Sequence, residues 1–418
     1  MSTANGSSFV VDDIAPARRS LRVALVTETY PPEVNGVAAT VARVVEGLRQ
    51  RGHQLQLIRP RQEKSERAGS AGDSERGALV LMAGMPIPRY PQLKLGLPAK
   101  RALLKLWSTQ RPDVVHVVTE GPLGWSALQA ALHLKLPVVS DFRTNFHSYS
   151  KHYGVGWLRA PVMAYLRKFH NRTACTMVPT EGLRSELAAA GFKGLRVVAR
   201  GVDTQGFSPA HRSDALRASW GADGRSMVAL CVGRLAPEKN LGAVLAAADA
   251  MRADDPRLRL VLVGDGPERE KLQQRSPGTI FAGVQRGADL AAHYASADVF
   301  LFGSMTETFG NVVPEAMASG LAVVAYDHAA AGQIIRHGDN GLLARLDDLA
   351  GFCALARRLA GDLPQARALG ERARATAARM DWGRIVESVE DEYLAAISGP
   401  ASLPNAAWEP ALPLRHPG

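Results

Sequence analysis

Two glutamates separated by seven residues lie in the segment 304–320, SMTETFGNVVPEAMASG, which follows the apolar run ADVFLF. Pro314 suits the first turn of a helix, so Glu307 falls in a loop and Glu315 in the opening turn. Two carboxylates beside exposed amides can bind hydroxyl groups at one end of a ligand and a phosphate at the other. An isolated pair is more simply a helix-start charge and a surface residue. The amides predicted to face the same pocket are those of Phe309, Gly310 and Asn311.

A second loop, VGRLAPEKNL, offers two cations. A strand is predicted to end at Gly233, after which Arg234 and Lys239 precede a helix capped near Asn240. Two cations beside the positive end of a helix suit a diphosphate. Single cations in a loop are more often solvated surface charges, so this pair gains weight only together with the glutamate segment.

A third loop, Thr27–Gly36, leads from an apolar run into a helix-length segment. A glycine at this point lets backbone N–H groups approach a phosphate, helped by the helix dipole. The loop has no G-x-G-x-x-G pattern, which disfavours a nicotinamide dinucleotide. An ordinary strand-to-helix turn would have a similar sequence.

These loops belong to a repeated pattern of short apolar runs and helix-length segments. The first half contains LRVALVT, LQLI, DVVHVV, PVVSDF, CTMVPT and LRVVARG, and the second half contains MVALCVG, LRLVLVG, TIFAG, ADVFLFG and LAVVAY. Such alternation predicts an α/β protein with two Rossmann-like, doubly wound domains that face each other across a cleft. Ligands of these sheets bind outside the carboxyl ends of the strands.

The predicted domain boundaries follow from turn-rich and polar segments. We expect a flexible N-terminus at 1–20, an N-terminal domain at 21–204 and a C-terminal domain at 205–380. A helix at 381–397 could pack back on either domain, and a Pro-rich tail at 398–418 is expected to be flexible. The charged, Gly- and Ser-rich stretch at 61–78 is predicted to be a mobile loop.

Composition excludes several classes of protein. The 418 residues are 46% hydrophobic and 22% charged, which is typical of a globular protein. No apolar run approaches the roughly 18 residues of a membrane span, and the polar opening lacks a signal-peptide layout. The three cysteines, Cys175, Cys231 and Cys353, form no Cys-x-x-Cys pair. We therefore expect a cytoplasmic protein without disulfides or a cysteine zinc site.

The charge is divided unevenly between the halves. Residues 1–200 hold 28 Lys and Arg against 14 Asp and Glu, whereas residues 201–418 hold 22 against 26. The excess suggests that the N-terminal half meets lipid headgroups, phosphates or nucleic acid, although solubility alone would also explain it. No aromatic-plus-basic recognition motif accompanies the charge, so a nucleic-acid partner is not expected.

The three loops together resemble the retaining glycosyltransferases of family 4, which have the GT-B fold. The resemblance rests on the Glu-x7-Glu signature, on GRLAPEKNL and on ETYPPEVNGVA, and it covers about Leu21 to Ile397. It implies that Glu315 holds the ribose hydroxyls of a nucleotide, and that Glu307 contacts the donor sugar. Arg234 and Lys239 would neutralise the diphosphate, and the amides from Phe309 to Val312 would bind sugar and phosphate oxygens.

The resemblance also implies the ligands. Gly36 would let the first loop close on the phosphates, Gly264 and Gly266 would shape the nucleotide pocket, and backbone groups near Val284 would contact the base. The donor would be a nucleotide sugar, GDP-mannose or a UDP-sugar, and the acceptor a lipid or a glycan. No Asp-x-Asp stands in either phosphate loop, so neither a metal nor another cofactor is expected.

The sequence departs from the family pattern at two places. The family often has His-Thr after the strand PVVSDF, whereas this chain has Arg143 there and His147 four residues later. His147 could replace the usual histidine, Arg143 could bind an anionic acceptor, or both could be structural. Gln333 occupies a position that is commonly acidic, which could alter donor-sugar preference.

The stretch 156–172, GWLRAPVMAYLRKFHNR, mixes aromatic and aliphatic residues with three arginines and a lysine. In relatives with lipid acceptors, a basic amphipathic element touches the membrane, so peripheral binding to an anionic membrane is one prediction. A core helix with a solvated basic face is the other.

Alternative functions remain for the whole chain. The same fold supports sugar-nucleotide epimerases and phosphorylases, and a basic nucleic-acid-binding protein is a more distant alternative.

Overall fold

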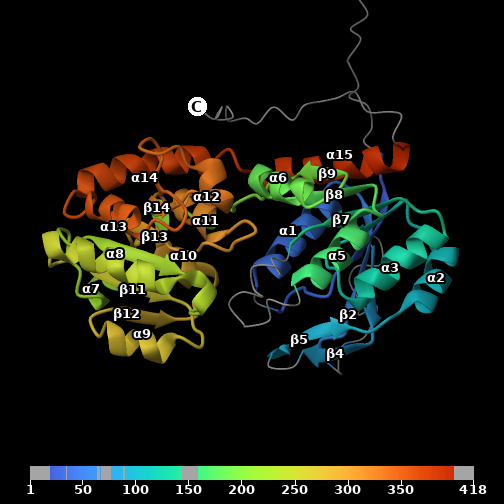
Figure 1. Cartoon of the computed structure of the whole chain (residues 1–418), viewed down its shortest axis with the longest axis horizontal. Helices are drawn as coiled ribbons and strands as arrows, with labels where there is room; N and C mark the ends of the chain where they lie inside the picture. The colour runs from blue at the N-terminus through green and yellow to red at the C-terminus, as the bar shows by residue number, and fades with distance from the viewer. Residues whose placement is uncertain are drawn as a thin grey trace, which may run out of the picture.

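The structure is a computed structural model that describes residues 19–33, 35–63, 66, 77–87, 90–143 and 159–399. Two α/β lobes lie side by side, the N-terminal lobe in blue to green and the C-terminal lobe in yellow to orange (Figure 1). Each lobe is built on one parallel sheet. The predicted fold class, two Rossmann-like domains, is therefore confirmed.

The N-terminal sheet has the strand order β3-β2-β1-β6-β7-β8-β9. Every pair along it is parallel. Its strands are β1 (Arg22–Val26), β2 (Gln54–Pro60), β3 (Gly77–Met82), β6 (Val114–Val117), β7 (Val138–Asp141), β8 (Cys175–Val178) and β9 (Leu195–Val197). A separate antiparallel hairpin, which the sequence did not predict, consists of β4 (Gly84–Ile87) and β5 (Tyr90–Gly96).

Alternate residues of these strands enter two different cores. Val23 and Leu25 of β1 pack with one cluster, whereas Ala24 and Val26 pack with another on the opposite face. Because helices cover both faces, the strands are continuous apolar runs rather than alternating ones. The helices of this lobe are α1 (Gly36–Gln50), α2 (Lys100–Thr109), α3 (Pro122–His133), α5 (Arg159–His170) and α6 (Glu181–Ala189).

The C-terminal sheet has the order β12-β11-β10-β13-β14-β15 and is also parallel throughout. Its strands are β10 (Val228–Val232), β11 (Arg259–Val263), β12 (Ile280–Gly283), β13 (Val299–Phe302), β14 (Ala322–Tyr326) and β15 (Leu342–Ala344). The sequence predicted the first five of these. It did not predict β15, which has only three residues.

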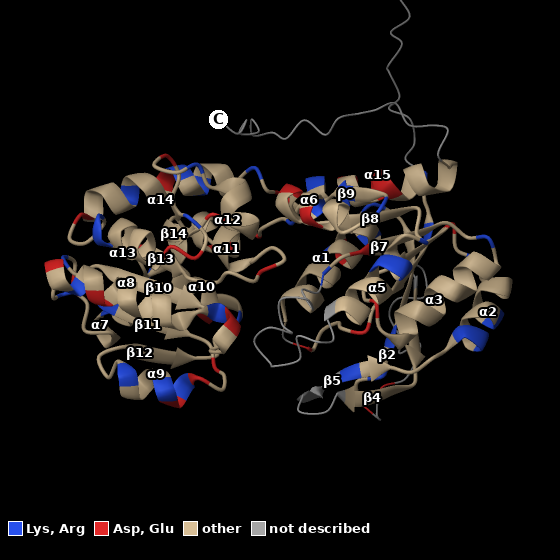
Figure 2. Cartoon of the chain, in the orientation of Figure 1, with Lys and Arg blue, Asp and Glu red and all other residues tan. Residues whose placement is uncertain are grey.

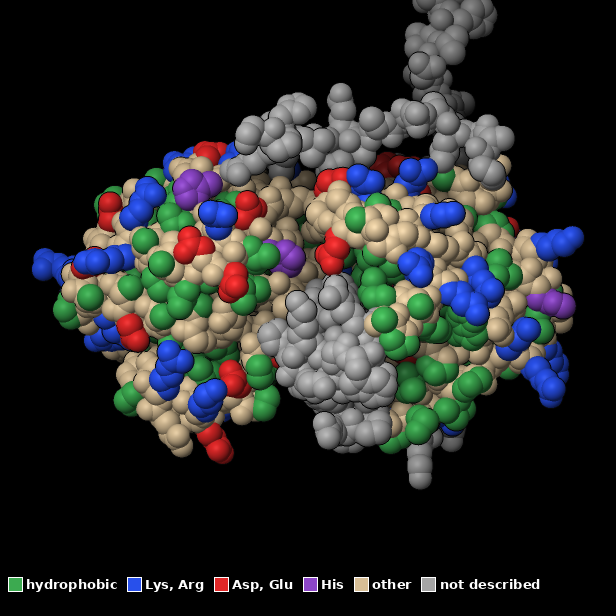
Figure 3. All heavy atoms as spheres, viewed as in Figure 1, with side chains coloured by type: hydrophobic (Ala, Val, Ile, Leu, Met, Phe, Trp, Pro, Cys, Tyr) green, Lys and Arg blue, Asp and Glu red, His purple; other side chains and the backbone are tan. Residues whose placement is uncertain are grey.

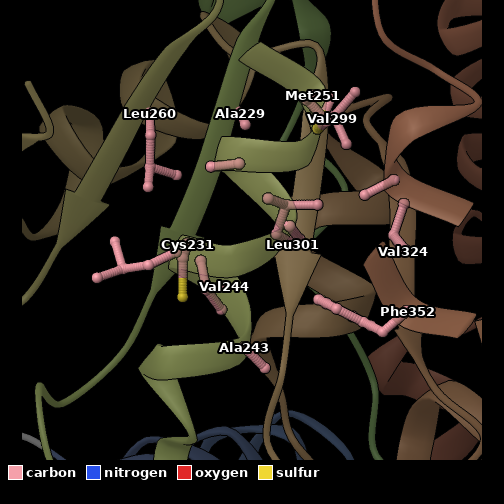
Figure 4. Close-up of a cluster of buried hydrophobic side chains, with 14 of the residues drawn as sticks. Ala229, Cys231, Ala243, Val244, Met251, Leu260, Val299, Leu301, Val324 and Phe352 are labelled. Carbon is pink, nitrogen blue, oxygen red and sulfur yellow. The ribbon is translucent and has the colours of Figure 1, made fainter. Parts of the chain in front are cut away.

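Helices enclose this second sheet in the same way. Figure 4 shows side chains of β10, β13 and β14 meeting those of α8 and α13, with the buried thiol of Cys231 among them. The helices are α7 (Asp214–Ser219), α8 (Leu241–Asp254), α9 (Arg269–Arg275), α10 (Gly287–Ala295), α11 (Val312–Ala318), α12 (Ala329–Ile334), α13 (Leu349–Arg357) and α14 (Leu363–Ala377). Two 3-10 turns lie at Pro209–His211 and Pro237–Lys239.

The last helix, α15 (Trp382–Ser398), drawn in red in Figure 1, crosses back to the N-terminal lobe, where it packs against α1. Val386, Val389 and Tyr393 of α15 are buried in the core that also holds β1 and α1. Arg51 at the end of α1 forms an ion pair with Glu390 at 2.6 Å. The chain thus passes twice between the lobes.

Candidate active site

Both parallel sheets present the carboxyl ends of their strands as loops that carry the predicted residues. In the C-terminal sheet, β10 and β13 are neighbours, and the connections from them run to opposite sides of the sheet. Such a switch in strand order opens a crevice for ligands at the carboxyl edge. The two predicted cations lie in the connection that follows β10, and the two predicted glutamates lie in the connection that follows β13, Glu307 in the loop and Glu315 in the first turn of α11.

Lys239 and Glu307 form an ion pair across these two loops. Ser304 donates a hydrogen bond of 2.9 Å from its hydroxyl to the Glu307 carboxylate. Burial alone would raise the pKa of Glu307, but Lys239 and Ser304 together hold that pKa below its ordinary value. Glu307 is therefore an anion at neutral pH, and the predicted convergence of the two loops is observed.

Arg234 is differently placed. Its guanidinium pairs with Glu238, four residues later, and the Arg234 side chain is 40% exposed. Glu238 is buried, and its backbone carbonyl accepts hydrogen bonds from the hydroxyls of Ser304 and Thr306. The helix expected after this loop begins at Leu241. Asn240 does not cap α8 through its side chain but turns the chain in a left-handed conformation with φ 49°.

Glu315 lies in the first turn of α11, as the position of Pro314 predicted. The buried hydroxyl of Tyr294, on α10, donates a hydrogen bond of 2.9 Å to Glu315. Burial raises the pKa of Glu315 from 4.5 to about 7, and the bond from Tyr294 offsets only part of that rise. Between pH 4.5 and about 7 the folded state holds more protons at Glu315 than the unfolded state. The contribution of Glu315 to the free energy of unfolding therefore falls as the pH rises through this range.

The amides between the glutamates point to a polar ligand. Among the described residues, the Gly310, Asn311 and Val312 N–H groups donate no hydrogen bond to a protein acceptor. Gly310 has φ 90°, a left-handed conformation that favours glycine and aims successive N–H groups outward. Phe309, by contrast, is a core residue with 1% of its surface exposed.

The same loop contacts the N-terminal lobe. The Asn311 amide donates to the Gly36 carbonyl at 3.5 Å and to the Thr40 hydroxyl at 3.4 Å. A Cβ on Gly36 would lie 3.5 Å from the Asn311 amide nitrogen. Thr308 donates to the Arg143 carbonyl at 3.4 Å. Gly36, Arg143 and the glutamate loop, each predicted separately, therefore lie together between the two lobes.

Close backbone packing explains why positions 264 and 266 are glycine, a reason that the sequence did not reveal. A Cβ on Gly264 would lie 1.9 Å from the Gly233 carbonyl oxygen, and one on Gly266 would lie 2.4 Å from that of Leu235. These glycines let the loop after β11 pack directly on the loop after β10. Val284 follows β12 and is 55% exposed.

Arg143 is held in place by a buried network that includes the last helix. Its guanidinium contacts Asp141, at the end of β7, at 2.5 Å and 2.7 Å. His116 lies 3.0 Å from the same carboxylate and 2.7 Å from the Tyr393 hydroxyl of α15. Burial would raise the pKa of Asp141, but Arg143 and His116 hold it well below its usual range. His147, the other candidate here, lies outside the described residues.

Gln333 links the two lobes rather than the glutamate loop. Its side-chain oxygen accepts a hydrogen bond of 3.1 Å from the Glu181 N–H group, at the start of α6. The prediction that Gln333 alters donor-sugar preference stays a prediction.

Arg200 was not predicted as a site residue. It follows β9, is 7% exposed, and its guanidinium carbon lies 5.5 Å from the centre of the Phe309 ring. A hydrogen bond of 3.4 Å joins it to the Asn311 side chain. The sequence contained one signal, a cation at the start of the turn-rich segment RGVDTQGF. A small cavity of about 20 Å³ lies beside Asp141, Arg143 and Arg200.

Among the described residues, no group of three or more His, Cys, Asp or Glu side chains is arranged to hold a metal ion. In that same part of the chain, no helix combines the length and the apolar character that crossing a membrane requires.

Comparison with known proteins agrees with this arrangement. The sequence model of Glycosyltransferase Family 4 matches residues 34–205, and that of Glycosyl transferases group 1 matches residues 226–362. The chain is 37% identical over 381 residues to a GDP-mannose-dependent alpha-mannosyltransferase of Mycolicibacterium smegmatis, which covers 90% of this chain and 98% of that protein. It is 28% identical over 320 residues to an alpha-monoglucosyldiacylglycerol synthase of Streptococcus pneumoniae, covering 73% of this chain and 71% of that protein.

The fold has solved counterparts as well. The sucrose-phosphate synthase of Thermosynechococcus elongatus superposes with a TM-score of 0.72 at 18% identity, over 90% of this chain and 98% of that structure. With both halves of the chain matched in order, the chain belongs to glycosyltransferase family 4 and is a glycosyltransferase.

Proposed function

We propose that the chain transfers a hexose, with mannose from GDP-mannose as the first choice and glucose from a UDP-sugar as the second, to a lipid or glycan acceptor. The mannosyltransferase relative, at 37% identity over nearly its whole length, supports the first donor. The glucosyldiacylglycerol synthase relative supports the second donor and a lipid acceptor.

The observation that carries this proposal is the Lys239–Glu307 pair, in the same loops as three N–H groups that donate to no acceptor among the described residues. The diphosphate of a nucleotide sugar has oxygens that can accept hydrogen bonds from both the Lys239 ammonium and the backbone N–H groups. When its phosphates approach Lys239, the ammonium exchanges a carboxylate partner for a phosphate partner, and Glu307 becomes able to accept hydrogen bonds from sugar hydroxyls. Arg234, which is partly exposed, would approach the same phosphates.

The nucleoside end would be held by Glu315. A carboxylate accepts hydrogen bonds from the two vicinal hydroxyls of a ribose, and Tyr294 fixes the orientation of this one. The packed glycine loop at Gly264 and Gly266 would form the adjacent wall, and backbone groups near Val284 would meet the base.

The N-terminal lobe would bind the acceptor. Gly36 would allow close approach of the α1 N-terminus to the phosphates, and Arg143 would contact the acceptor or the transferred sugar. We keep His147 as a second candidate for that contact.

The reaction breaks the bond between the anomeric carbon and the phosphate oxygen, and the electron pair stays on that oxygen. The acceptor hydroxyl forms the new bond to the anomeric carbon on the face that the phosphate leaves, so the configuration is retained. Its proton passes to the departing diphosphate, which is the nearest base on that face. Lys239, Arg234 and the loop amides stabilise the charge that builds on the diphosphate.

We also propose peripheral binding to an anionic membrane surface through the N-terminal lobe. Helix α2 exposes Lys100, Arg101 and Lys105, seen as blue on the far right of Figure 2. The apolar side chains of Leu97 and Leu132 are 38% and 43% exposed on elements that contact α2 or adjoin it. Figure 3 shows basic and hydrophobic side chains interspersed on this lobe.

Helix α5 contributes less to such a surface than the sequence suggested. Its Leu166 and Phe169 side chains are buried, as the alternative of a core helix with a basic face expected. Trp157 and Leu158, in the same stretch, lie outside the described residues.

The donor proposal is tested by thermal unfolding with GDP or UDP. A ligand that binds only the folded state at roughly 100 times its dissociation constant adds about 2.7 kcal/mol, a clear rise in Tm. A rise with GDP alone indicates GDP-mannose, and a rise with UDP alone indicates a UDP-sugar. No rise with either nucleotide contradicts the proposal.

The ribose role of Glu315 predicts pH-dependent nucleotide affinity. With a pKa of about 7, roughly a tenth of the Glu315 side chains are ionised at pH 6 and nine-tenths at pH 8. We expect calorimetric affinity for the nucleotide to rise up to about tenfold across this range. In Glu315→Gln the phosphates of the nucleotide still titrate, but the rise in affinity that comes from ionisation of Glu315 should be lost. Equal pH profiles for the two proteins would exclude the role.

Replacing Lys239 with Ala should lower turnover by about two to three orders of magnitude, because one fixed charge facing the diphosphate is lost. The measurement is release of nucleoside diphosphate from the donor sugar. Lys271→Ala is the matched control, because Lys271 also pairs with a glutamate in the C-terminal lobe but is 76% exposed. Similar rates for both variants would remove Lys239 from the diphosphate site.

Membrane binding should be electrostatic and should depend on α2. We expect flotation with phosphatidylglycerol vesicles to fall as salt rises, and to fall further when Lys100 and Lys105 are both changed to Gln. The control changes Arg367 and Arg374, exposed on α14 of the other lobe, to Gln. Flotation that ignores salt, or an equal loss in both double variants, would contradict the proposal.

A further inference from the structure

Arg200 carries a charge that no carboxylate in the described part of the chain balances. Other buried arginines have close acidic partners: Arg217 lies 3.0 Å from Asp298, and Arg143 lies 2.5 Å from Asp141. Arg200 is comparably buried, yet its only polar contact with another described residue is the 3.4 Å hydrogen bond to the neutral Asn311 amide. Its guanidinium has five N–H donors, so most of its hydrogen-bonding capacity is unused.

The surroundings increase this positive charge. Arg143 is close enough to act on Arg200, and burial followed by this charge lowers the pKa of Arg200 to about 9, so it stays protonated at neutral pH. Asp141 faces Arg200 as well but is already bound by Arg143 and His116. Glu307, the other nearby carboxylate, is paired with Lys239.

The C-terminal lobe fixes the position of the Arg200 side chain. The Phe309 ring lies under its guanidinium, and Asn311, its hydrogen-bond partner, contacts Gly36 and Thr40 at the start of α1. Arg200 therefore lies where the glutamate loop, the α1 N-terminus and the Asp141–Arg143 cavity meet. A buried, unpaired charge costs folding free energy, and a fixed position in a site is the arrangement expected of a residue that a ligand completes.

We propose that Arg200, together with the Asn311 side chain, binds an oxyanion, a phosphate or carboxylate group, that enters between the two lobes. The inference rests on the proposed function for the location of the ligand. Two sources share this chemistry. The oxyanion is either the distal phosphate of the donor nucleotide, or a separate anionic group carried by the acceptor or the sugar.

The test uses Arg200→Gln in the full-length chain. If the donor phosphate is the ligand, the variant binds GDP or UDP about ten- to a hundredfold more weakly, as for loss of one charged hydrogen-bond contact. Its affinity for GMP or UMP then stays at the wild-type value. If a separate anion is the ligand, wild-type protein saturated with nucleotide still binds inorganic phosphate in a calorimetric titration, and the variant does not.

Two further variants separate binding from structure. Arg200→Lys keeps the charge without the planar fork and should recover part of the lost affinity. Arg43→Gln is the matched control, because Arg43 pairs at 2.5 Å with Asp203 near the same crossing point but is 54% exposed. It should bind both probes as the wild type does. Because the variant removes an unbalanced buried charge, Arg200→Gln without ligand should unfold at the wild-type Tm or above it.

Wild-type affinity of Arg200→Gln for both probes would overturn the proposal. So would equal weakening of diphosphate and monophosphate binding, or a Tm several degrees lower, since each indicates a structural role. Failure of the proposed function is a different result, namely no binding of GDP or UDP by the wild-type protein. The phosphate titration without nucleotide still tests Arg200 in that case.

Discussion

Parallel pairing in the two large sheets determines where this protein can hold a ligand. All strands of a parallel sheet end at one edge, so the loops that follow β10 and β13 must meet although about 70 residues separate them in the sequence. That meeting brings Lys239 to Glu307. The same constraint in the N-terminal sheet brings the end of β7, with Asp141 and Arg143, toward the glutamate loop.

The charges of the site are largely balanced within the protein. Lys239 pairs with Glu307 and Arg234 pairs with Glu238, so each cation that is predicted to bind phosphate already has a carboxylate partner. An arriving diphosphate would exchange these partners rather than meet free cations, which keeps the desolvation cost of the empty site low. Arg200 is different because no carboxylate among the described residues pairs with it. Its guanidinium is held in position by Phe309 and Asn311 of the opposite lobe.

Local sequence patterns were sufficient to predict most elements and the connections in which the cations and glutamates lie, because these connections directly follow apolar runs. Patterns failed where the cause is non-local. Arg200 approaches Phe309 across more than a hundred residues, and the Tyr294 bond to Glu315 joins two helices. The three-residue strand β15 is too short for periodicity to reveal. Gly264 was predicted for a ligand, whereas its nearest neighbour is the backbone of Gly233.

The return of α15 to the N-terminal lobe has a consequence for synthesis of the chain. Val386 and Val389 complete the core around β1, and Tyr393 supports His116 and, through Asp141, Arg143. These side chains leave the ribosome only after all strands of both sheets. The lobe made first therefore waits, with part of its core uncovered, until the second lobe has emerged. A premature stop codon before Trp382 would thus damage the N-terminal lobe, although that lobe is encoded first, and would remove the support of Arg143.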